Sequence, residues 1–304
     1  MPNELSLGEI SGLAKQLSNF GLRHIVYSGG EPLLRRDFKE ICEIFAAYGV
    51  KQTLLTNGLL LGKRYGELRS YFNEIVVSID GADEQTHNGI RGIKSFTQIT
   101  QAISSITHEN ERRPAISIRT VLQKQNYNQV MRMVDLAKTL GVDRISFLAA
   151  DVLSDSFGRN TRGVVEANDK IELDEAGSIE FRSLINQMSK EYKKEFDRKF
   201  ISESPEKLLH IAQYFEALIG KANFPQNHCN APDVSAVITS TGDLMPCFFL
   251  PSQGNIRDNK VESILNNAEM RKIRQNVRNY CLERCQTCVC TLKINRPSLL
   301  FNRI

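Results

Sequence analysis

Cysteines are the residues of this chain whose number and spacing most clearly indicate chemistry. Six of the seven cysteines in the 304 residues lie after residue 228: Cys229, Cys247, Cys281, Cys285, Cys288 and Cys290. Disulfide frameworks belong mostly to small secreted domains, whereas clustered thiols in a long chain more often bind metal. Cys42 stands apart on an expected helix, at a core-facing position where we expect a structural thiol. The sequence therefore predicts a metal centre in the C-terminal region.

An expected hairpin brings the first two of these thiols together. The apolar run Val234–Thr239, the turn at Gly242 and the return through Leu244 are typical of two short antiparallel strands. Cys229 precedes this hairpin and Cys247 follows it, so we expect the two thiols to lie close to each other.

The remaining cysteines supply the other ligands of the expected centre. Cys285 and Cys288 form a Cys-x2-Cys pair, which can give two thiolates to one metal centre. Cys281 and Cys290 are spare thiols that could replace one of these ligands. Four sulfurs suit a structural zinc ion or a [4Fe–4S] cluster, so the spacing alone leaves the metal open.

Small and polar residues follow several expected strands: Ser28-Gly29-Gly30-Glu31, Thr56-Asn57, Ser78, Asp80 and Arg119. Glycines let backbone groups approach a ligand closely, and a carboxylate such as Glu31 could bind an amine. Hydroxyl, Asn and Asp groups suit a ribose, and Arg119 could pair with a carboxylate. Together these groups describe a site for an amino-acid nucleoside. Each residue also has a structural explanation, namely a tight turn for the glycines, a cap or turn for Thr56 and Asp80, and an internal ion pair for Arg119.

The elements expected to position these residues alternate between helix and strand with a period of about thirty residues. Apolar periodicity predicts helices over Leu7–Phe20, Phe38–Phe45, Lys63–Tyr71, Phe96–Ile106 and Tyr127–Leu140, and strands over His24–Tyr27, Gln52–Thr56, Glu74–Ile79, Ala115–Val121 and Arg144–Leu148. This alternation is typical of a parallel α/β sheet, which binds ligands at the carboxyl ends of its strands. Because the chain opens on a helix, we expect the first strand of such a sheet to be missing.

The chain divides into three expected segments. Residues 1–172 form the α/β part, residues 173–222 a helical connection, and residues 223–304 a small cysteine-rich domain. The connection contains a charged helical stretch, Asp174–Phe200, and a helix opened by Ser204-Pro205-Glu206. The polar loop Asp151–Lys170 is a candidate for substrate contacts or simply a long solvated connection.

Composition excludes several classes of function. The formal charge of +4 is modest. The sequence contains no Lys/Arg tract interleaved with aromatic residues, which is the pattern that would indicate nucleic-acid binding. The sequence contains no run of about 18 apolar residues, so it gives no indication of a membrane span. Met1–Leu5 does not show a basic segment followed by an apolar one, so we expect no secretory signal and a cytoplasmic location.

The two sets of residues together resemble the radical S-adenosylmethionine (SAM) superfamily, in particular members with a SPASM or shorter twitch extension. Ser28-Gly29-Gly30-Glu31-Pro32 resembles the motif that holds the SAM amino group, Thr56-Asn57-Gly58 the third strand end and Ser78-Ile79-Asp80-Gly81 the fourth. Cys229-x12-Gly242-x4-Cys247 is similar to the extension's signature, Cys-x(9–15)-Gly-x4-Cys. This resemblance implies a partial (β/α)6 TIM-like barrel missing its first strand, with a small SPASM/twitch domain. It also implies SAM contacts from Gly29, Gly30 and Glu31, more loosely from Ser78, Asp80 and Arg119, and iron–sulfur rather than zinc.

Two departures from the family pattern qualify this expectation. The later cysteines are separated by three, two and one residues, unlike the Cys-x2-Cys-x5-Cys-x3-Cys of full SPASM members, which implies one auxiliary cluster. No cysteine precedes Cys42, so the family's Cys-x3-Cys-x2-Cys motif for the catalytic cluster is not in this sequence. We expect that the chain begins inside a longer reading frame or a truncated gene; a protein that has lost its radical chemistry is the other explanation.

The resemblance implies a radical SAM enzyme of the peptide or cofactor maturation class with an auxiliary [4Fe–4S] cluster. Such enzymes cleave SAM reductively, and a 5′-deoxyadenosyl radical abstracts a substrate hydrogen. Expected partners are SAM, an unidentified peptide or tetrapyrrole-like precursor, and a reductase, flavodoxin or ferredoxin. No residue of this chain is assigned a catalytic role, and enzymatic activity of the chain alone stays open. The alternatives are a non-catalytic iron–sulfur binding or electron-transfer module on a degenerate scaffold, and a zinc-stabilised α/β protein.

Overall fold

The elements of the fold come from a computed structural model that describes residues 3–109, 113–154, 156 and 171–294. The strands are β1 (His24–Tyr27), β2 (Lys51–Thr56), β3 (Glu74–Ser78), β4 (Ala115–Leu122), β5 (Arg144–Ala149), β6 (Val237–Ile238) and β7 (Leu244–Met245). The first helices are α1 (Leu7–Asn19), α2 (Phe38–Ala46), α3 (Leu61–Leu68), α4 (Glu84–Arg91), α5 (Phe96–Thr107) and α6 (Val130–Thr139). They are followed by α8 (Glu175–Glu191), α9 (Lys193–Asp197), α10 (Pro205–Leu218), α11 (Ala231–Val234), α12 (Val261–Leu265), α13 (Ala268–Arg278) and α14 (Glu283–Gln286). Short 3-10 helices occupy η1 (Pro32–Leu34), η2 (Arg69–Tyr71) and η3 (Tyr127–Gln129).

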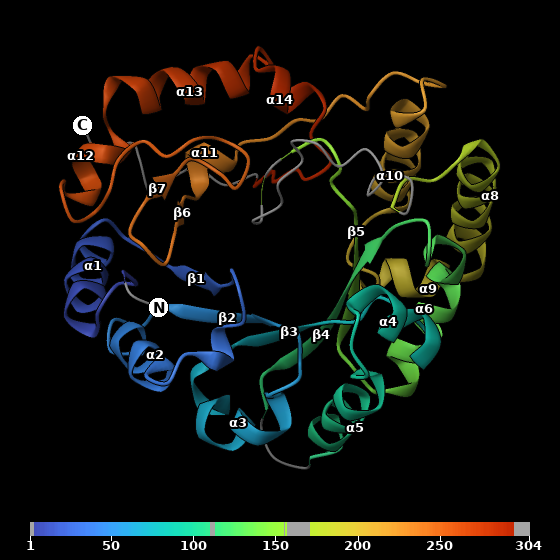
Figure 1. The fold of residues 1–304 in the computed structure, drawn as a ribbon, viewed down its shortest axis with the longest axis horizontal. Helices are drawn as coiled ribbons and strands as arrows, with labels where there is room; N and C mark the ends of the chain where they lie inside the picture. Colours follow the sequence, from blue (N-terminus) through green and yellow to red (C-terminus); the bar gives the residue numbers. More distant parts are fainter. Residues whose placement is uncertain (1–2, 110–112, 155, 157–170, 295–304) are drawn as a thin grey trace.

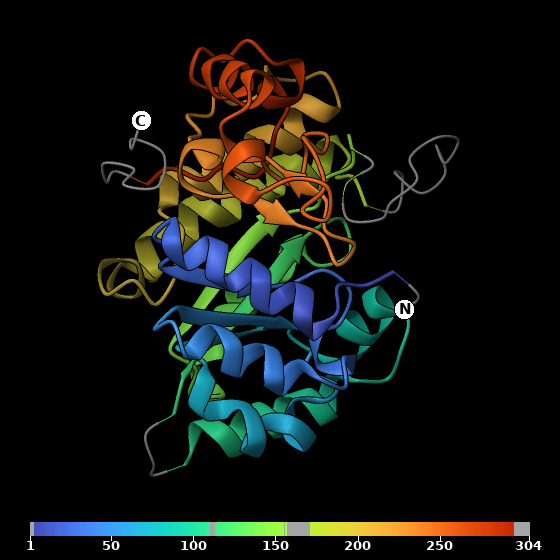
Figure 2. The ribbon, with the colours of Figure 1, turned by 90° about the vertical axis from the view of Figure 1, so that its left-hand side faces the viewer.

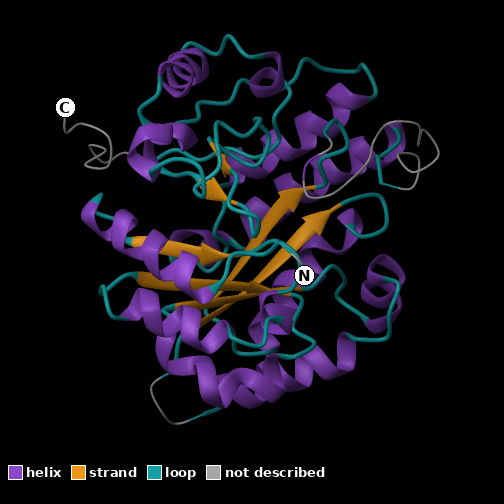
Figure 3. Cartoon of the chain, turned by 60° about the vertical axis from the view of Figure 1, so that its left-hand side comes forward, coloured by secondary structure: helices purple, strands orange, loops and turns teal. Residues whose placement is uncertain are grey.

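The central sheet consists of β1 to β5, all parallel and in chain order. Figure 1 shows the first helices along the outer side of this curved sheet, with the orange and red C-terminal part facing its other side. In Figure 3 the strands fan out with the twist that parallel sheets show. The structure thus confirms the expected α/β fold and partial barrel.

The sheet continues beyond β5 by a single parallel bridge. Ile201 pairs with Ile145, where the Ile145 N–H donates to the Phe200 carbonyl and the Ser202 N–H donates to the Ile145 carbonyl. The sequence predicts that this stretch follows a charged helix running from Asp174 to Phe200. The helix is instead broken at Tyr192, and Lys199 has a φ of 60°, which turns the chain back towards the sheet.

Strand β4 shows how the sheet separates its two faces. Ile116, Ile118 and Leu122 are fully buried in the core that the sheet shares with the helices. Because side chains alternate along a strand, Ser117 and Arg119 lie on the opposite, inner face. That inner face carries these polar side chains, and it is the face that the C-terminal part covers in Figure 2.

Several described helices were not expected from the sequence, among them α4, α11 and the helices α12 to α14. Helix α4 begins at the Asp83 cap, whose carboxylate accepts from the Thr86 N–H, and ends at Gly92, which has a φ of 71°. Helix α11 takes up the start of the run expected as a strand, because Pro232 lies in its first turn. The hairpin is confirmed but short, with β6 pairing antiparallel to β7 around the Gly242 turn.

Helix α1 packs against both parts of the chain. The Leu5 N–H donates to the Ser240 carbonyl at 2.7 Å, and Arg257 binds the Glu9 carboxylate at 2.5 Å. The Val261 N–H donates to the Gln16 side chain at 3.0 Å, which joins α1 to the start of α12. The cysteine-rich part is therefore docked directly on the first helix of the barrel.

The expected domain limits at residues 172 and 222 stay predictions, and most of the candidate substrate loop 151–170 lies outside the described residues. Within the described ranges, no helix is both long enough and apolar enough to span a membrane.

Candidate functional site

Glu31 lies where β1 and β2 end, and its carboxylate is held in place by its neighbours. Its Oε1 atom accepts from the Thr56 hydroxyl at 2.8 Å and from the Leu33 N–H at 3.1 Å, and its Oε2 atom accepts from the Asn57 N–H at 2.7 Å. A carboxylate has about four acceptor positions, so these three bonds leave capacity for one more donor. An ammonium group is a donor that this anion would bind well.

Gly29 and Gly30 form the turn that leads into Glu31. Gly29 has a φ of 113°, a conformation that favours glycine, and a Cβ added at either residue would meet no atom within 4 Å. The space beside this turn is therefore open, as a ligand approaching the backbone requires.

Arg119, Ser78 and Ser146 form a polar row across three neighbouring strands. The register places Ser78 of β3 beside Arg119 of β4, and Arg119 beside Ser146 of β5. The Arg119 Nε atom donates to the Ser146 hydroxyl at 3.1 Å. Among the described residues, nothing hydrogen-bonds to the terminal guanidinium nitrogens of Arg119 or to the Ser78 hydroxyl, so both could contact a ligand.

Asp80 is committed to contacts within the chain. Only 4% of the residue is exposed; one carboxylate oxygen accepts from the Val121 N–H at 2.9 Å and the other binds Arg91 at 2.7 Å. Burial raises the pKa of this carboxyl, against the opposing effect of Arg91. The structure thus supports the alternative that Asp80 fixes the turn after β3, rather than the looser expectation that it contacts a ribose.

The C-terminal thiols gather where the hairpin, α13 and α14 meet. Cys229, Cys247 and Cys285 pack against a small apolar cluster of Leu250, Ile273 and Val277. The Leu250 N–H donates to the Cys247 backbone carbonyl at 3.4 Å, and the Ala231 N–H donates to the Cys229 sulfur at 3.4 Å.

Cys285 and Cys288 complete the group. Charges on Cys229 and Cys247 influence Cys285, and a charge on Cys229 influences Cys288, so the four thiols share one neighbourhood. Burial raises the pKa of Cys285 to about 11 and that of Cys288 to about 12. Both thiols are therefore protonated in the chain alone at neutral pH, and metal binding would displace these protons.

The two spare thiols differ in their surroundings. Cys281 is exposed, and its thiol donates to the Asn279 carbonyl at 3.4 Å. Cys290 is half-buried, and its backbone carbonyl accepts from the Cys288 thiol at 2.7 Å. Cys290 is thus the nearer candidate to replace one of the four.

Cys42 lies in the core of the barrel. The residue is fully buried on α2, and burial raises the pKa of its thiol to about 12. This agrees with the structural role expected for it, and its burial leaves it unable to bind a cluster beside Glu31.

A group of charged residues that the sequence analysis did not single out connects the thiols to the barrel. Asp151 and Glu203 carry acidic groups, and Lys207 and Arg284 carry basic ones. Arg284 donates to Asp151 at 3.0 Å, and Lys207 donates to the Thr291 hydroxyl at 2.5 Å. Burial raises the pKa of Glu203, whose carboxylate accepts from the Phe147 N–H, and lowers that of Lys207. The only signal in the sequence was the position of Arg284 between two cysteines.

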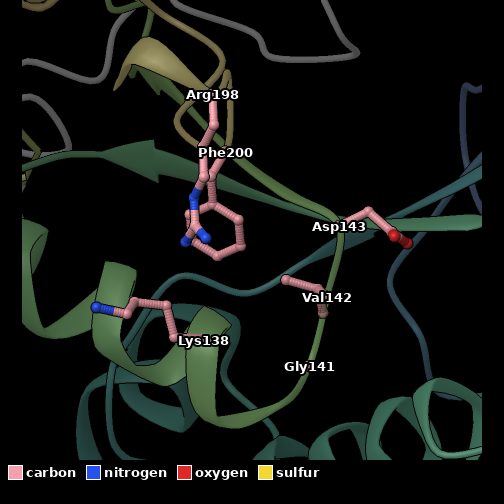
Figure 4. Close-up of a pocket in the computed structure, with 6 residues that line it drawn as sticks. All are labelled: Lys138, Gly141, Val142, Asp143, Arg198 and Phe200. Atoms are coloured by element: carbon pink, nitrogen blue, oxygen red, sulfur yellow. The ribbon is translucent and has the colours of Figure 1, made fainter. Parts of the chain in front are cut away.

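One hollow formed by described residues lies elsewhere. It encloses about 390 Å³ between the end of α6 and the start of β5, lined by Lys138, Gly141, Val142, Asp143, Arg198 and Phe200 (Figure 4). This is the amino end of β5, opposite to the end at which parallel βα sheets bind their ligands. We therefore do not assign the hollow to the site around Glu31.

Four thiols are the donor set that an iron–sulfur cluster takes. Within the described ranges, no three Cys, His, Asp or Glu side chains converge closely enough to hold one metal ion. A zinc ion needs four sulfurs about 2.3 Å from one point, whereas a [4Fe–4S] cluster spreads its four thiolates over four iron atoms. N–H groups directed at cysteine sulfur also stabilise thiolate ligands.

Comparison with known proteins found a family match for each of the two parts of the chain. The profile of the radical SAM superfamily matches residues 1–137, and the profile of an iron–sulfur cluster-binding domain, SPASM, matches residues 229–289. The chain therefore belongs to the radical SAM superfamily and carries a SPASM domain at its C-terminal end. Membership implies iron–sulfur and SAM cofactors.

Relatives of known name fall into several reaction classes. The chain is 29% identical over 184 residues to a probable GTP 3',8-cyclase of Sulfurisphaera tokodaii, covering 59% of the chain and 58% of that relative. It is 26% identical over 291 residues to the AdoMet-dependent heme synthase of Methanosarcina barkeri, covering 89% and 76%.

Solved structures share the fold. Streptococcus suis SuiB bound to its precursor peptide SuiA aligns with a TM-score of 0.64 at 17% identity, covering 89% of this chain and 60% of SuiB. The anSMEcpe protein with bound AdoMet aligns with a TM-score of 0.64 at 16% identity, covering 89% and 74%. The chain thus spans about three-fifths of the length of the Sulfurisphaera tokodaii cyclase and of SuiB.

Proposed function

We propose that this chain supplies the SAM-binding barrel and one auxiliary [4Fe–4S] cluster of a radical SAM enzyme that matures a peptide or a tetrapyrrole-like precursor. The observation that carries the proposal is the pairing of a fixed, incompletely satisfied Glu31 carboxylate at the strand ends with four neighbouring thiols in the C-terminal part. The names of SuiB, with its precursor peptide, and of the heme synthase support the two substrate classes.

Each part of the barrel mouth has a role in this proposal. Glu31 binds the SAM ammonium group, and the open turn at Gly29 and Gly30 lets the backbone approach it. The Ser78 hydroxyl and the Arg119 guanidinium are placed for the ribose and the carboxylate. These residues bind and orient the nucleoside; reductive cleavage of SAM is chemistry that a cluster chelating it supplies.

The thiolates of that chelating cluster come, in this proposal, from outside these 304 residues. Cys42 is the only cysteine before Cys229, and it is fully buried in the core. Cys229, Cys247, Cys285 and Cys288 hold the auxiliary cluster in the C-terminal part. A flavodoxin, ferredoxin or reductase would deliver the electrons.

Iron uptake tests the auxiliary cluster. After anaerobic reconstitution with iron and sulfide, the chain should bind about four irons, absorb near 400 nm and give a reduced-cluster EPR signal. Cys247→Ala should lose most of the iron, whereas the matched variant Cys281→Ala should keep it, because Cys281 is exposed and turned towards Asn279. Zinc without iron in the wild-type chain, or equal loss in both variants, would contradict the proposal.

The second candidate is a non-catalytic iron–sulfur or electron-transfer module. The observation that favours it is that the described barrel offers no thiol beside Glu31. Formation of 5′-deoxyadenosine separates the two candidates. Under dithionite, the 304-residue chain should form none, and a longer protein that adds a Cys-x3-Cys-x2-Cys segment should form it. A longer protein that binds the second cluster and still leaves SAM intact would favour the module.

A further inference from the structure

Arg284 stands out because part of its guanidinium is buried without a partner. Only 17% of its side chain is exposed, and its Nη2 atom donates to the Asp151 carboxylate at 3.0 Å. The Nε and Nη1 atoms are buried, and nothing among the described residues accepts a hydrogen bond from either. Leaving one buried donor unsatisfied destabilises the folded chain, and does so more strongly for a charged group. Two such donors on one cation indicate that an acceptor belongs beside them.

The position of Arg284 identifies the kind of acceptor. It directly precedes Cys285, and its guanidinium lies over the Phe249 ring at 4.6 Å from the centroid. Phe249 follows Cys247 by two residues. The guanidinium is thus held between two loops that each carry a proposed cluster ligand.

The fixed orientation of the group strengthens this placement. Asp151, which is 3% exposed, holds one edge of the guanidinium, and the Phe249 ring covers one of its flat faces. Because the guanidinium is planar, its remaining N–H groups are confined to the rest of its rim. The Arg284 charge also acts on Cys247, Cys285 and Cys288, where it opposes the rise in thiol pKa that burial causes.

We propose that Arg284 is a positioning residue of the auxiliary cluster, which donates hydrogen bonds to the cluster sulfurs and raises its reduction potential. The inference rests on the proposed function, since it requires a cluster bound by the four thiols. Uptake of one electron adds a negative charge to the cluster, and a fixed neighbouring cation stabilises the reduced form. Hydrogen bonds to the sulfurs and the local net charge are the factors through which proteins set such potentials.

The ion pair with Asp151 also connects Arg284 to the barrel. Asp151 comes two residues after the end of β5, at the edge of the sheet where the strands present their carboxyl ends. Arg284 therefore joins the cluster loop to the barrel mouth through one ion pair. A substrate that displaced or neutralised Asp151 would change the field at the cluster, which links substrate binding to the potential.

A potentiometric titration of the reconstituted chain, monitored by EPR under anaerobic conditions, tests the inference. Arg284→Gln should keep its iron and titrate at a lower midpoint potential than the wild type. Arg284→Lys keeps the charge but not the planar fork, so its midpoint should lie between the two. Arg271→Gln removes the same charge from an exposed position of α13 and should leave the midpoint close to the wild-type value.

The outcomes separate this inference from the proposed function. A wild-type chain that takes up no iron–sulfur cluster refutes both. A fully loaded Arg284→Gln chain with an unchanged midpoint, or one shifted no further than Arg271→Gln, refutes the role of Arg284 alone. If Arg284→Gln fails to fold, the midpoint potential of Arg284→Lys tests the inference instead. A midpoint equal to that of the wild type would refute the proposed hydrogen bonds from Arg284 to the cluster sulfurs.

Discussion

The Glu31 carboxylate offers the sharpest single perturbation of the barrel mouth. Glu31→Gln keeps the size and shape of the side chain but replaces one acceptor oxygen by an NH2 group, which only donates. In the structure, Oε2 accepts from the Asn57 N–H, and Oε1 accepts from the Leu33 N–H and the Thr56 hydroxyl. Whichever way the amide turns, one backbone N–H faces a second donor.

The expected loss follows from this geometry. The Thr56 hydroxyl can rotate, but the Asn57 and Leu33 N–H groups are fixed by the backbone, so at least one remains unsatisfied. One unsatisfied backbone donor corresponds to about 1–3 kcal/mol of unfolding free energy. If Glu31 also binds the SAM ammonium, loss of a charged hydrogen bond worth about 1.5–3 kcal/mol weakens SAM binding about 10- to 150-fold.

Chemical denaturation and equilibrium dialysis with labelled SAM measure the two effects. Glu40→Gln serves as the control, because Glu40 is exposed on α2 and loses the same charge. A Glu31→Gln chain within about 0.5 kcal/mol of the control would show that the hydrogen bonds described for Glu31 do not form. A SAM affinity equal to that of the control would refute the assignment of Glu31 to the ammonium group.

Two further predictions concern the supports of the site. Gly58→Ala should lower the unfolding free energy, measured by denaturation, by about 1–3 kcal/mol more than Gly49→Ala. Both glycines have positive φ, but of the two only Gly58 would bring a Cβ within 2.9 Å of Val77 and Ile99. Equal losses in the two variants would contradict this crowding at Gly58. The buried His87 accepts from the Asp80 N–H through Nδ1, which requires the neutral ring, and burial lowers its pKa from 6.5 to about 4. A depressed folded pKa contributes stability that is present above pH 6.5 and lost as the pH falls towards 4. Denaturation between pH 7 and 4 should show a loss of the order of 3 kcal/mol at the full shift, which His87→Asn should largely abolish; identical slopes for the two chains would contradict it.

The sequence was sufficient for features that depend on local pattern. Strand β4 was expected over Ala115–Val121 and is found over Ala115–Leu122, because its alternating apolar side chains are buried against helices on one face. The Cys229–Cys247 hairpin was expected from its Gly242 turn and is present, with a φ of 92° at the glycine.

The features that were missed depend on contacts between distant segments or on short capping signals. Asp151 and Arg284 are 133 residues apart, so neither could be recognised as half of a buried pair before the fold was known. Helix α4 is only eight residues long and mostly polar, and its start is marked by little more than the Asp83 cap. From the sequence, the Asp80 carboxylate could have bound a ribose. The structure shows that it already binds the Arg91 side chain and the Val121 N–H.

The attachment of α1 to the far end of the chain also bears on how the protein is made. Helix α1 leaves the ribosome long before its partners, because Leu5, Glu9 and Gln16 contact Ser240, Arg257 and Val261. These contacts therefore form only after the chain has been synthesised beyond residues 240, 257 and 261. In a nascent chain, α1 gains these contacts only when the C-terminal part has been made. A protease that cut between the two parts would leave them joined through α1.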